Sequence, residues 1–207
     1  ISYVCVQHEQ AAAMMADSYS RVGPNFAATM STSGPGATNL ITGIACSYFD
    51  SIPNLHITGQ VNTYEQKGSM PGTQNARQVG FQETDIVSIS KPITKASVQL
   101  KKADDIHQIL EKLYKISQEG RQGPVLLDVP MDLQRVYVKK KSRKQKVKTK
   151  IKSNFKINNF NNKIINLIQN SQRPVLISGG GVRYSKSIEI FNKLILILKL
   201  PVVTTWS

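Results

Sequence analysis

A glutamate stands where an apolar run gives way to a helix of small residues. Residues 3–6, YVCV, have the composition of a buried strand, and they lead through His8 to Glu9 and the helical pattern EQAAAMMADSYSR. The carboxyl end of a strand beside a helix start is where ligands bind in open α/β sheets. On an apolar floor of small residues a carboxylate has a raised pKa and can share a proton with a ligand nitrogen. A salt-bridged or helix-capping glutamate is the alternative that the residues leave open.

A second candidate site is the loop at residues 31–36, STSGPG. It follows a predicted strand, and a helix is expected to begin near Thr38 or Asn39. The glycines on either side of Pro35 let the backbone approach a ligand closely, and a helix N-terminus favours partial negative charge. The loop matches neither the phosphate-binding loop nor the Gly-x-Gly-x-x-Gly fingerprint. A tight strand-to-helix turn without a ligand explains it equally well.

A third candidate is the group Phe81, Gln82, Glu83 and Asp85, which follows a long stretch without regular pattern at residues 61–80. Long loops in compact domains often carry function. A solvated acidic turn is the alternative.

The elements that would position these residues alternate along the chain. Apolar runs and helical patterns follow one another, which predicts an α/β fold with parallel sheets and helices on both faces. The runs PVLLDVP and PVLISGGG are largely apolar, as expected of strands covered on both faces. Strands are predicted at residues 3–6, 26–30, 54–57, 125–129, 174–177 and 201–204, and helices at residues 10–21, 38–48, 103–118, 159–168 and 185–198.

Composition divides the chain into three parts. A first domain is predicted at residues 1–132, a basic linker at 133–157 and the start of a second α/β domain at 158–207. Both ends fall within or just after strand-like runs, so we expect an internal piece of a longer protein. The net charge of +14 is concentrated between residues 135 and 156, which hold 11 Lys and Arg and no acid. A solvated linker is favoured there over a phosphate-binding patch.

The bulk composition indicates an ordinary intracellular protein. No run approaches the roughly 18 to 20 apolar residues of a membrane span. Cys5 and Cys46 lie among small apolar residues, which predicts buried free thiols and a reducing compartment. We therefore expect a cytoplasmic protein that binds neither membrane nor nucleic acid.

Five motifs, taken in order, resemble the thiamine-diphosphate enzymes and are most similar to acetohydroxyacid (acetolactate) synthase large subunits. They are HEQAAAMMADSYSRVG, TSGPGATNLITGIACSYFDSIP, ITGQV, GFQETDIVSISKPITKAS and GPVLLDVPMDLQ. The resemblance covers residues 1–132 closely and continues more loosely through RPVLISGGGV and LPVVTTW. It implies that residues 1–132 are the pyrimidine-binding domain, truncated at its start, and that residues 158–207 begin the central domain.

The resemblance gives Glu9 a specific catalytic role. In the family, the glutamate of the HEQ motif bonds to N1′ of the cofactor's aminopyrimidine. The imino tautomer that this favours removes the proton from thiazolium C2, and the activated cofactor then serves as electron sink. Further roles implied by the resemblance are cofactor contacts at Pro35, Gly36 and Asn39, substrate-facing positions at Phe81 and Gln82 (Gln82 also catalytic), and a position near the active-site entrance and subunit contact at Gln60.

The implied reaction is decarboxylation of pyruvate and carboligation to a second 2-oxo acid, as in branched-chain amino-acid biosynthesis. Here NARQVGFQE replaces the usual GTDAFQE and resembles a related branch, so a decarboxylase or carboligase of another pathway stays open. A nucleic-acid-binding module built on the basic run and a non-catalytic homologue are rivals from other classes.

The resemblance also implies cofactors and partners. Mg²⁺ would be held by a C-terminal domain whose Gly-Asp-Gly…Asn motif is not in this sequence, and no metal ligand is assigned here. FAD is expected on the central domain. A homodimer or higher homo-oligomer with a regulatory subunit is expected as well. Because the family's active site forms between two subunits, the isolated piece is predicted to be inactive.

Overall fold

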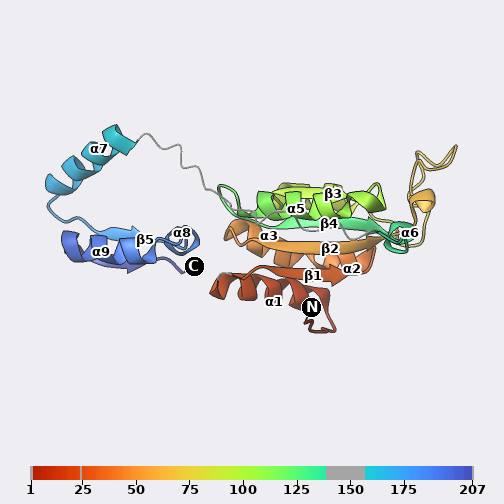
Figure 1. Cartoon of the computed structure of the whole chain (residues 1–207), viewed down its shortest axis with the longest axis horizontal. Coiled ribbons are helices and arrows are strands. Elements are labelled where there is room, and N and C mark those ends of the chain that lie inside the picture. Colours follow the sequence, from red (N-terminus) through yellow and green to blue (C-terminus); the bar gives the residue numbers. More distant parts are fainter. Residues whose placement is uncertain (1, 24, 139–156, 207) are drawn as a thin grey trace. The chain divides into compact units, whose positions relative to one another are not determined.

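The computed structural model describes residues 2–23, 25–138 and 157–206 (Figure 1). The chain divides into two compact units, Ile1–Lys148 and Thr149–Ser207. Most of the predicted basic linker, residues 139–156, lies outside the described residues. Each unit is described by itself.

The first unit is built on a four-stranded parallel sheet with the order β1-β2-β4-β3. The predicted parallel sheet is thus confirmed. Its strands are β1 (Ala27–Ser31), β2 (Asn54–Gln60), β3 (Ala96–Gln99) and β4 (Val125–Pro130).

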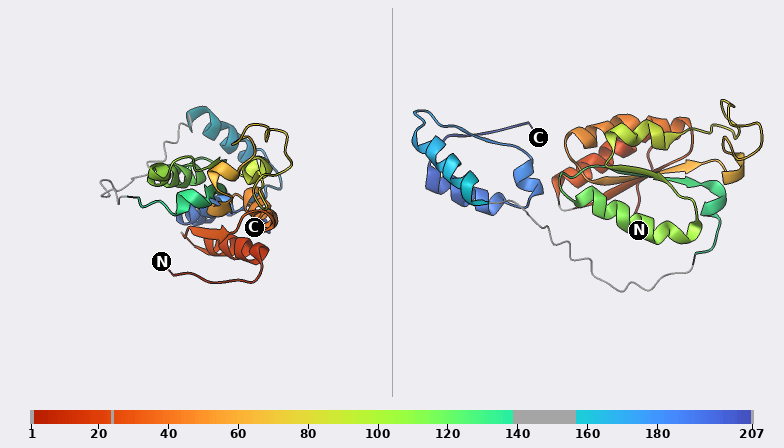
Figure 2. Two further views of the ribbon diagram at one scale, coloured as in Figure 1. Left: turned by 90° about the vertical axis from the view of Figure 1, so that its right-hand side faces the viewer. Right: turned by 90° about the horizontal axis from the view of Figure 1, so that it is seen from above.

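Helices cover both faces of this sheet, as predicted (Figure 2). On β4, Leu126 packs with the cluster formed by the helices from α1 to α4, whereas Val125 and Leu127 pack with α5 on the opposite face. This alternation is the period-2 pattern of a strand buried on both sides. The helices are α1 (Glu9–Val22), α2 (Pro35–Asn39), α3 (Ile41–Phe49), α4 (Ile86–Ser90), α5 (Ile106–Gln118) and α6 (Met131–Gln134), with 3₁₀ turns η1 (Thr63–Glu65), η2 (Lys91–Ile93) and η3 (Ala103–Asp105).

The strand predicted at residues 3–6 is not formed. Residues 2–6 have no regular structure, and the side chain of Tyr3 is 84% exposed. A strand is stable only when its backbone groups pair with a neighbour, and no strand of the sheet pairs with this segment. The apolar run is therefore irregular and exposed to solvent here.

The helical region predicted at residues 38–48 begins earlier and is divided into α2 and α3. Pro35 is the first residue of α2, where its fixed φ suits the helix and its missing N–H costs no bond. Gly34 precedes it with φ 60°, a conformation that favours glycine. The glycine-proline pair of the loop is thus the start of the helix.

The prediction of buried thiols is wrong, because Cys5 and Cys46 are both exposed. Cys5 lies in the unpaired N-terminal segment. On α3 the inward face is taken by Gly43, Ile44 and Ser47, so Cys46 points outward.

The second unit begins with an α/β pattern. Strands β5 (Leu176–Ser178) and β6 (Val202–Thr204) are parallel, and they are accompanied by α7 (Ile157–Gln169), α8 (Gly181–Tyr184) and α9 (Ile188–Leu198). Among the described residues of either unit, no helix has the length and apolar character needed to cross a membrane.

Candidate functional site

The candidate residues come from segments at the carboxyl ends of the parallel strands. The loop at 32–34 leaves β1 and enters α2, and the segment at 61–80 follows β2 and projects beyond that edge (Figure 1). Helix α1 contributes its N-terminal residue, Glu9. Three stretches far apart in the sequence therefore supply the site.

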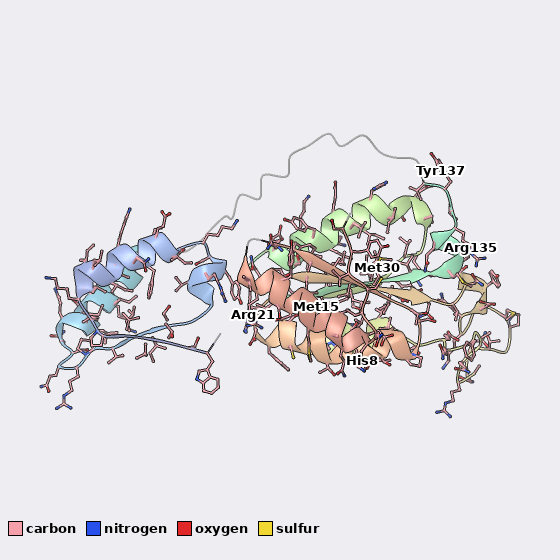
Figure 3. The ribbon with its side chains drawn as sticks, turned by 90° about the horizontal axis from the view of Figure 1, so that it is seen from below. His8, Met15, Arg21, Met30, Arg135 and Tyr137 are labelled. Atoms are coloured by element: carbon pink, nitrogen blue, oxygen red, sulfur yellow. The ribbon has the colours of Figure 1, made fainter. Side chains whose placement is uncertain are left out.

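Glu9 is joined to the glycine-rich segment by a hydrogen bond. Asn39 Nδ2, at the end of α2, donates to Glu9 Oε2 over 2.8 Å, and it lies 3.4 Å from His8 Nε2. His8 caps α1, since its Nδ1 accepts the N–H of Gln10 at 3.3 Å. Figure 3 shows His8 at the end of α1 opposite to Arg21. The two residues that were predicted separately to contact a cofactor are thus in direct contact.

The glycines of the loop leave no room for larger side chains. A Cβ added to Gly36 would lie 3.2 Å from Glu9 Oε1 and 2.6 Å from Thr32 Cγ2. A Cβ on Gly34 would lie 2.6 Å from the Cβ of Gln82. The loop therefore touches Glu9 on one side and the residue predicted to face the substrate on the other.

The pKa of Glu9 is lowered, whereas the sequence predicted a raised one. The side-chain hydrogen bond from Asn39 is the largest cause, and the backbone N–H of Glu9 itself acts in the same direction. The prediction assumed an enclosed apolar floor, but the carboxylate is only half-buried and has a donor. Glu9 is thus held in its ionised form.

The exposed Phe81 and the partly buried Gln82 form a turn beside the glycine loop. The ring of Phe81 is 82% exposed, so it has no core role in the described residues. Gln82 has φ 60°, the left-handed conformation that costs a non-glycine residue about 1 kcal/mol or more. Such strain is typical of residues at functional sites.

Gln60 is buried beneath this turn. Its Nε2 donates to the carbonyl of Thr84 at 2.7 Å and to Asp128 Oδ2 at 3.2 Å. Asp128 also accepts from Thr58 at 2.8 Å and from Gln99 at 2.9 Å. Burial raises the pKa of Asp128 despite these donors. Gln60 thus supports the turn through Thr84 in this structure, and its expected position near the active-site entrance stays a prediction.

A second buried polar chain links α1 and α3 to the sheet. Ser47 Oγ donates to Asp17 Oδ2 at 2.8 Å and accepts from Asn54 Nδ2 at 2.8 Å. Asn54 Oδ1 lies 2.9 Å from His56 Nε2, and Thr29 Oγ1 lies 2.8 Å from His56 Nδ1. Because the amide oxygen can only accept, Nε2 carries the proton and Nδ1 accepts from Thr29.

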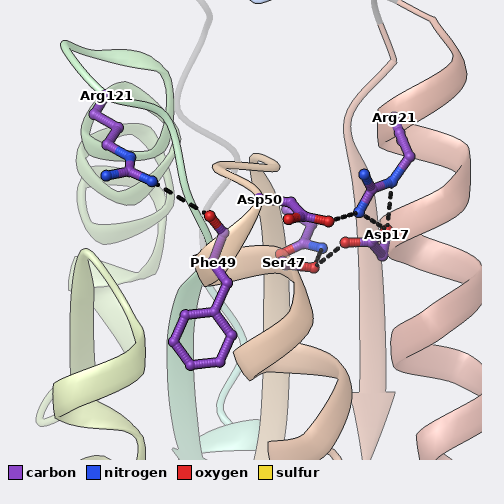
Figure 4. A network of polar contacts seen from close by, with 7 residues as sticks. Asp17, Arg21, Ser47, Phe49, Asp50 and Arg121 are labelled. Carbon is purple, nitrogen blue, oxygen red and sulfur yellow. Dashed lines mark hydrogen bonds and ion pairs between the residues drawn. The ribbon is translucent and has the colours of Figure 1, made fainter. Parts of the chain in front are cut away.

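Arg21 extends this chain to the surface. Its guanidinium lies 2.9 Å from Asp17 Oδ1 and 2.6 Å from Asp50 Oδ2, and on α3 the carbonyl of Phe49 accepts from Arg121 (Figure 4). None of these groups contacts Glu9. The chain belongs to the scaffold.

A pocket of about 280 Å³ lies at the amino ends of the strands, away from the candidate site. It is lined by Tyr48, Phe49, Lys95, Arg121 and Gln122. Both of its cations are already hydrogen-bonded to protein, Arg121 to Ser51 Oγ at 2.7 Å and the Lys95 amine to the carbonyl of Glu119.

Within the described ranges, no cluster of His, Cys, Asp or Glu could hold a metal ion.

Two features of the site were missed from the sequence, namely the left-handed conformation of Gly34 and the buried Asp128. Glu83 was among the candidates, but its hydrogen bonds to the backbone were not predicted. A single acid inside the apolar run PVLLDVP could have indicated Asp128, since a buried carboxylate needs donors. The roles of Gly34 and Glu83 depend on backbone geometry that spacing alone does not give.

Comparisons with known proteins place two domain models of one enzyme family on this chain. The model of the thiamine pyrophosphate enzyme N-terminal TPP binding domain matches residues 1–89, and that of the family's central domain matches residues 161–207. Thiamine pyrophosphate is another name for thiamine diphosphate.

Similar proteins are acetolactate synthase large subunits. That of Buchnera aphidicola subsp. Acyrthosiphon pisum is 36% identical over 99% of this chain and 35% of its own length. That of Lactococcus lactis is 34% identical over 99% of this chain and 34% of its own length. That of Pyropia yezoensis is 39% identical over 99% of this chain and 34% of its own length. The chain thus spans about a third of the length of the curated relatives it matches. With both domain models matched in order, the chain belongs to the thiamine pyrophosphate enzymes.

Proposed function

We propose that this chain supplies the pyrimidine-binding half of the active site of a thiamine-diphosphate-dependent acetolactate synthase. The observation that carries the proposal is the ionised carboxylate of Glu9, held by Asn39 beside the close-packed glycine loop. The similarity to acetolactate synthase large subunits supports the choice of reaction.

The residues fit the aminopyrimidine of the cofactor. Glu9 Oε2 is occupied by Asn39, while Oε1 faces the space that a Cβ on Gly36 would enter. An ionised carboxylate is a strong acceptor for a protonated ring nitrogen. Glu9 and Asn39, with Pro35 and Gly36 along the loop, would therefore hold the pyrimidine.

The chemistry is then divided between cofactor and protein. Thiamine diphosphate, when bound, supplies the nucleophilic carbon and the electron sink for decarboxylation of a 2-oxo acid. Glu9 shares a proton with the ring nitrogen, and the donor from Asn39 keeps the carboxylate ready to accept it. Phe81 and Gln82 would face the substrate from the neighbouring turn, with Gln82 as the polar group that contacts the reacting 2-oxo acid.

Further parts of the proposal concern the whole protein. We assign residues 1–132 to the pyrimidine-binding domain, 133–157 to a linker and 158–207 to the start of the central domain. Mg²⁺ and the diphosphate would be held outside this chain, and FAD would lie on the central domain. A cytoplasmic homo-oligomer with a regulatory subunit is proposed, and the 207-residue chain alone is expected to give no turnover.

A related carboligase or decarboxylase is the second candidate. It is favoured by the sequence RQVGFQE, since the residues before Phe81 differ from those usual in acetohydroxyacid synthases. The products separate the two candidates.

The test uses the full-length protein with pyruvate, thiamine diphosphate and Mg²⁺, and identifies products by NMR. Acetolactate is expected from the wild type, with a loss of about 100-fold or more in Glu9→Gln, because the variant cannot take up the proton. Glu111→Gln, an exposed glutamate of α5, is the matched control and should keep full activity. Equal activity of Glu9→Gln and the wild type would contradict the proposed role of Glu9. A product other than acetolactate would favour the second candidate.

A further inference from the structure

The segment between β2 and the turn at Phe81 is long and nearly free of regular structure. Residues 61–80 hold only the 3₁₀ turn η1. Lys67 and Arg77 are exposed within it. A segment of this kind samples many conformations unless specific contacts hold it.

A single carboxylate holds this segment at two points. Glu83 Oε1 accepts the N–H of Lys67 at 2.5 Å, and Oε2 accepts the N–H of Val79 at 2.8 Å. The backbone N–H of Glu83 also donates to the carbonyl of Gly80 at 3.1 Å. Hydrogen bonds to a charged group are stronger than neutral ones, so these contacts hold Lys67 and Val79 firmly against the turn.

The same side chain lies next to the strained residue of the site. Gln82 precedes Glu83 and keeps φ 60°, and its Cβ is in close contact with the position of Gly34. On the other side, the carbonyl of Thr84 accepts from the buried Gln60. The left-handed turn is therefore held by Gln60 through the carbonyl of Thr84 and by the bonds that Glu83 makes to residues 67 and 79.

We propose that Glu83 is a positioning residue for the substrate-facing turn. By closing residues 67–79 into a loop, its carboxylate keeps Gln82 in the left-handed conformation against the glycine loop, and it sets the direction of the exposed Phe81. Glu83 touches neither the cofactor nor the substrate in this role. The inference rests on the proposed function for its effect on catalysis, whereas the closure of the loop stands on the contacts alone.

The loop closure is tested by limited proteolysis of the full-length protein. Trypsin should cleave after Lys67 and Arg77 about tenfold faster or more in Glu83→Gln than in the wild type, because the amide group cannot accept both N–H groups. Glu83→Asp, which keeps the charge on a shorter side chain, should fall between the two. Glu111→Gln serves as the control for the loss of one charge. Unchanged cleavage in Glu83→Gln would overturn the proposal.

The positioning role is tested by two further measurements. Amide hydrogen exchange of residues 81–84 should accelerate in Glu83→Gln, a result that does not depend on any activity. In steady-state kinetics the KM for pyruvate should rise several-fold, while the affinity for thiamine diphosphate stays within about twofold, since Glu9 and Asn39 are untouched. Faster cleavage with unchanged exchange at 81–84 would overturn the link to Gln82. If the wild type makes no acetolactate, the proposed function fails, and proteolysis with hydrogen exchange still decides the role of Glu83.

Discussion

At the scale of single residues, the buried histidine makes the stability of the first unit depend on pH. His56 is fully buried, and desolvation lowers its pKa from 6.5 to about 3. Below pH 6.5 His56 binds a proton in the unfolded chain but stays neutral in the folded chain. Stability is therefore complete above pH 6.5 and falls by about 1.4 kcal/mol per pH unit as the pH drops toward 3.

This slope can be assigned to His56 by substitution. Urea unfolding of the wild type should show a loss of about 2 kcal/mol between neutral pH and pH 5. His56→Gln should be less stable at neutral pH, because its hydrogen bonds to Thr29 and Asn54 are disturbed, but it should lose most of the slope. His107→Gln, at an exposed position of α5, should keep the slope of the wild type. Parallel pH profiles for wild type and His56→Gln would contradict the assignment.

A second residue-scale prediction concerns the ionisation of Glu9. Asn39→Ala removes the largest cause of its lowered pKa, so the pKa should rise. The carboxyl carbon of Glu9 in a ¹³C-labelled protein reports the titration by NMR. Gln10→Ala is the control, because Gln10 donates to Thr42 Oγ1 rather than to Glu9. A pKa that stays unchanged in Asn39→Ala would show that this hydrogen bond does not set it.

At the scale of elements, the sequence predicted what depends on local pattern. Alternating apolar runs and helical stripes gave the sheet strands β1, β2 and β4 and the helices α1 and α5. Strand β3 and helix α4 were not predicted. Their apolar runs are short, and β3 is stabilised by pairing with β4 rather than by its own pattern. The expected strand at residues 3–6 failed for the converse reason, since its pattern is strong but none of the described strands pairs with it.

The candidate site divides in the same way. Glu9, the glycine loop and the turn at Phe81 could be found from residue types and from the family resemblance. Their mutual contacts could not, because the Asn39 to Glu9 bond and the packing of Gly34 on Gln82 depend on how distant elements meet. The predicted direction of the Glu9 pKa shift was wrong because the sequence did not show the hydrogen bond from Asn39.

The crossing of α1 and α3 gives a prediction for the element scale. A Cβ on Gly43 would lie 2.4 Å from the Cβ of the buried Ala13, so the two helices are in contact at this point. Alanine is the better helix former by about 1 kcal/mol, yet Gly43→Ala should destabilise the unit by about 1 to 3 kcal/mol through overpacking. Thermal unfolding measures the effect. The double variant with Ala13→Gly should recover part of the loss, and a Gly43→Ala protein more stable than the wild type would disprove the close contact.

At the scale of the whole molecule, the charge is unevenly divided. Eleven of the 27 basic residues fall between residues 135 and 156, and the rest of the chain holds 16 basic and 13 acidic residues. A cluster of basic side chains binds polyanions without specificity, and this binding weakens as the salt concentration rises. The candidate site at Glu9 and Asn39 contains no residue of this run.

Polyanion binding by the basic run and cofactor binding at the candidate site should therefore be lost in different variants. Replacement of the lysines between 139 and 152 by glutamine should abolish retention of the full-length protein on heparin at low salt, while thiamine diphosphate binding is unchanged. Glu9→Gln should behave oppositely, with retention kept and cofactor binding weakened. Loss of cofactor binding in the lysine variant would revive a functional role for the basic run.

The strand order also has a consequence for the synthesis of the protein. Strand β4 lies between β2 and β3, although the ribosome makes it after both. Until residues 125–130 have emerged, the nascent chain has no strand with which β3 can pair, and Gln60 lacks the carboxylate of Asp128. The half-made domain therefore presents two open strand edges to chaperones and to other nascent chains. Gln60, which holds the turn that bears Gln82, gains its bond to Asp128 only when this last strand enters the middle of the sheet.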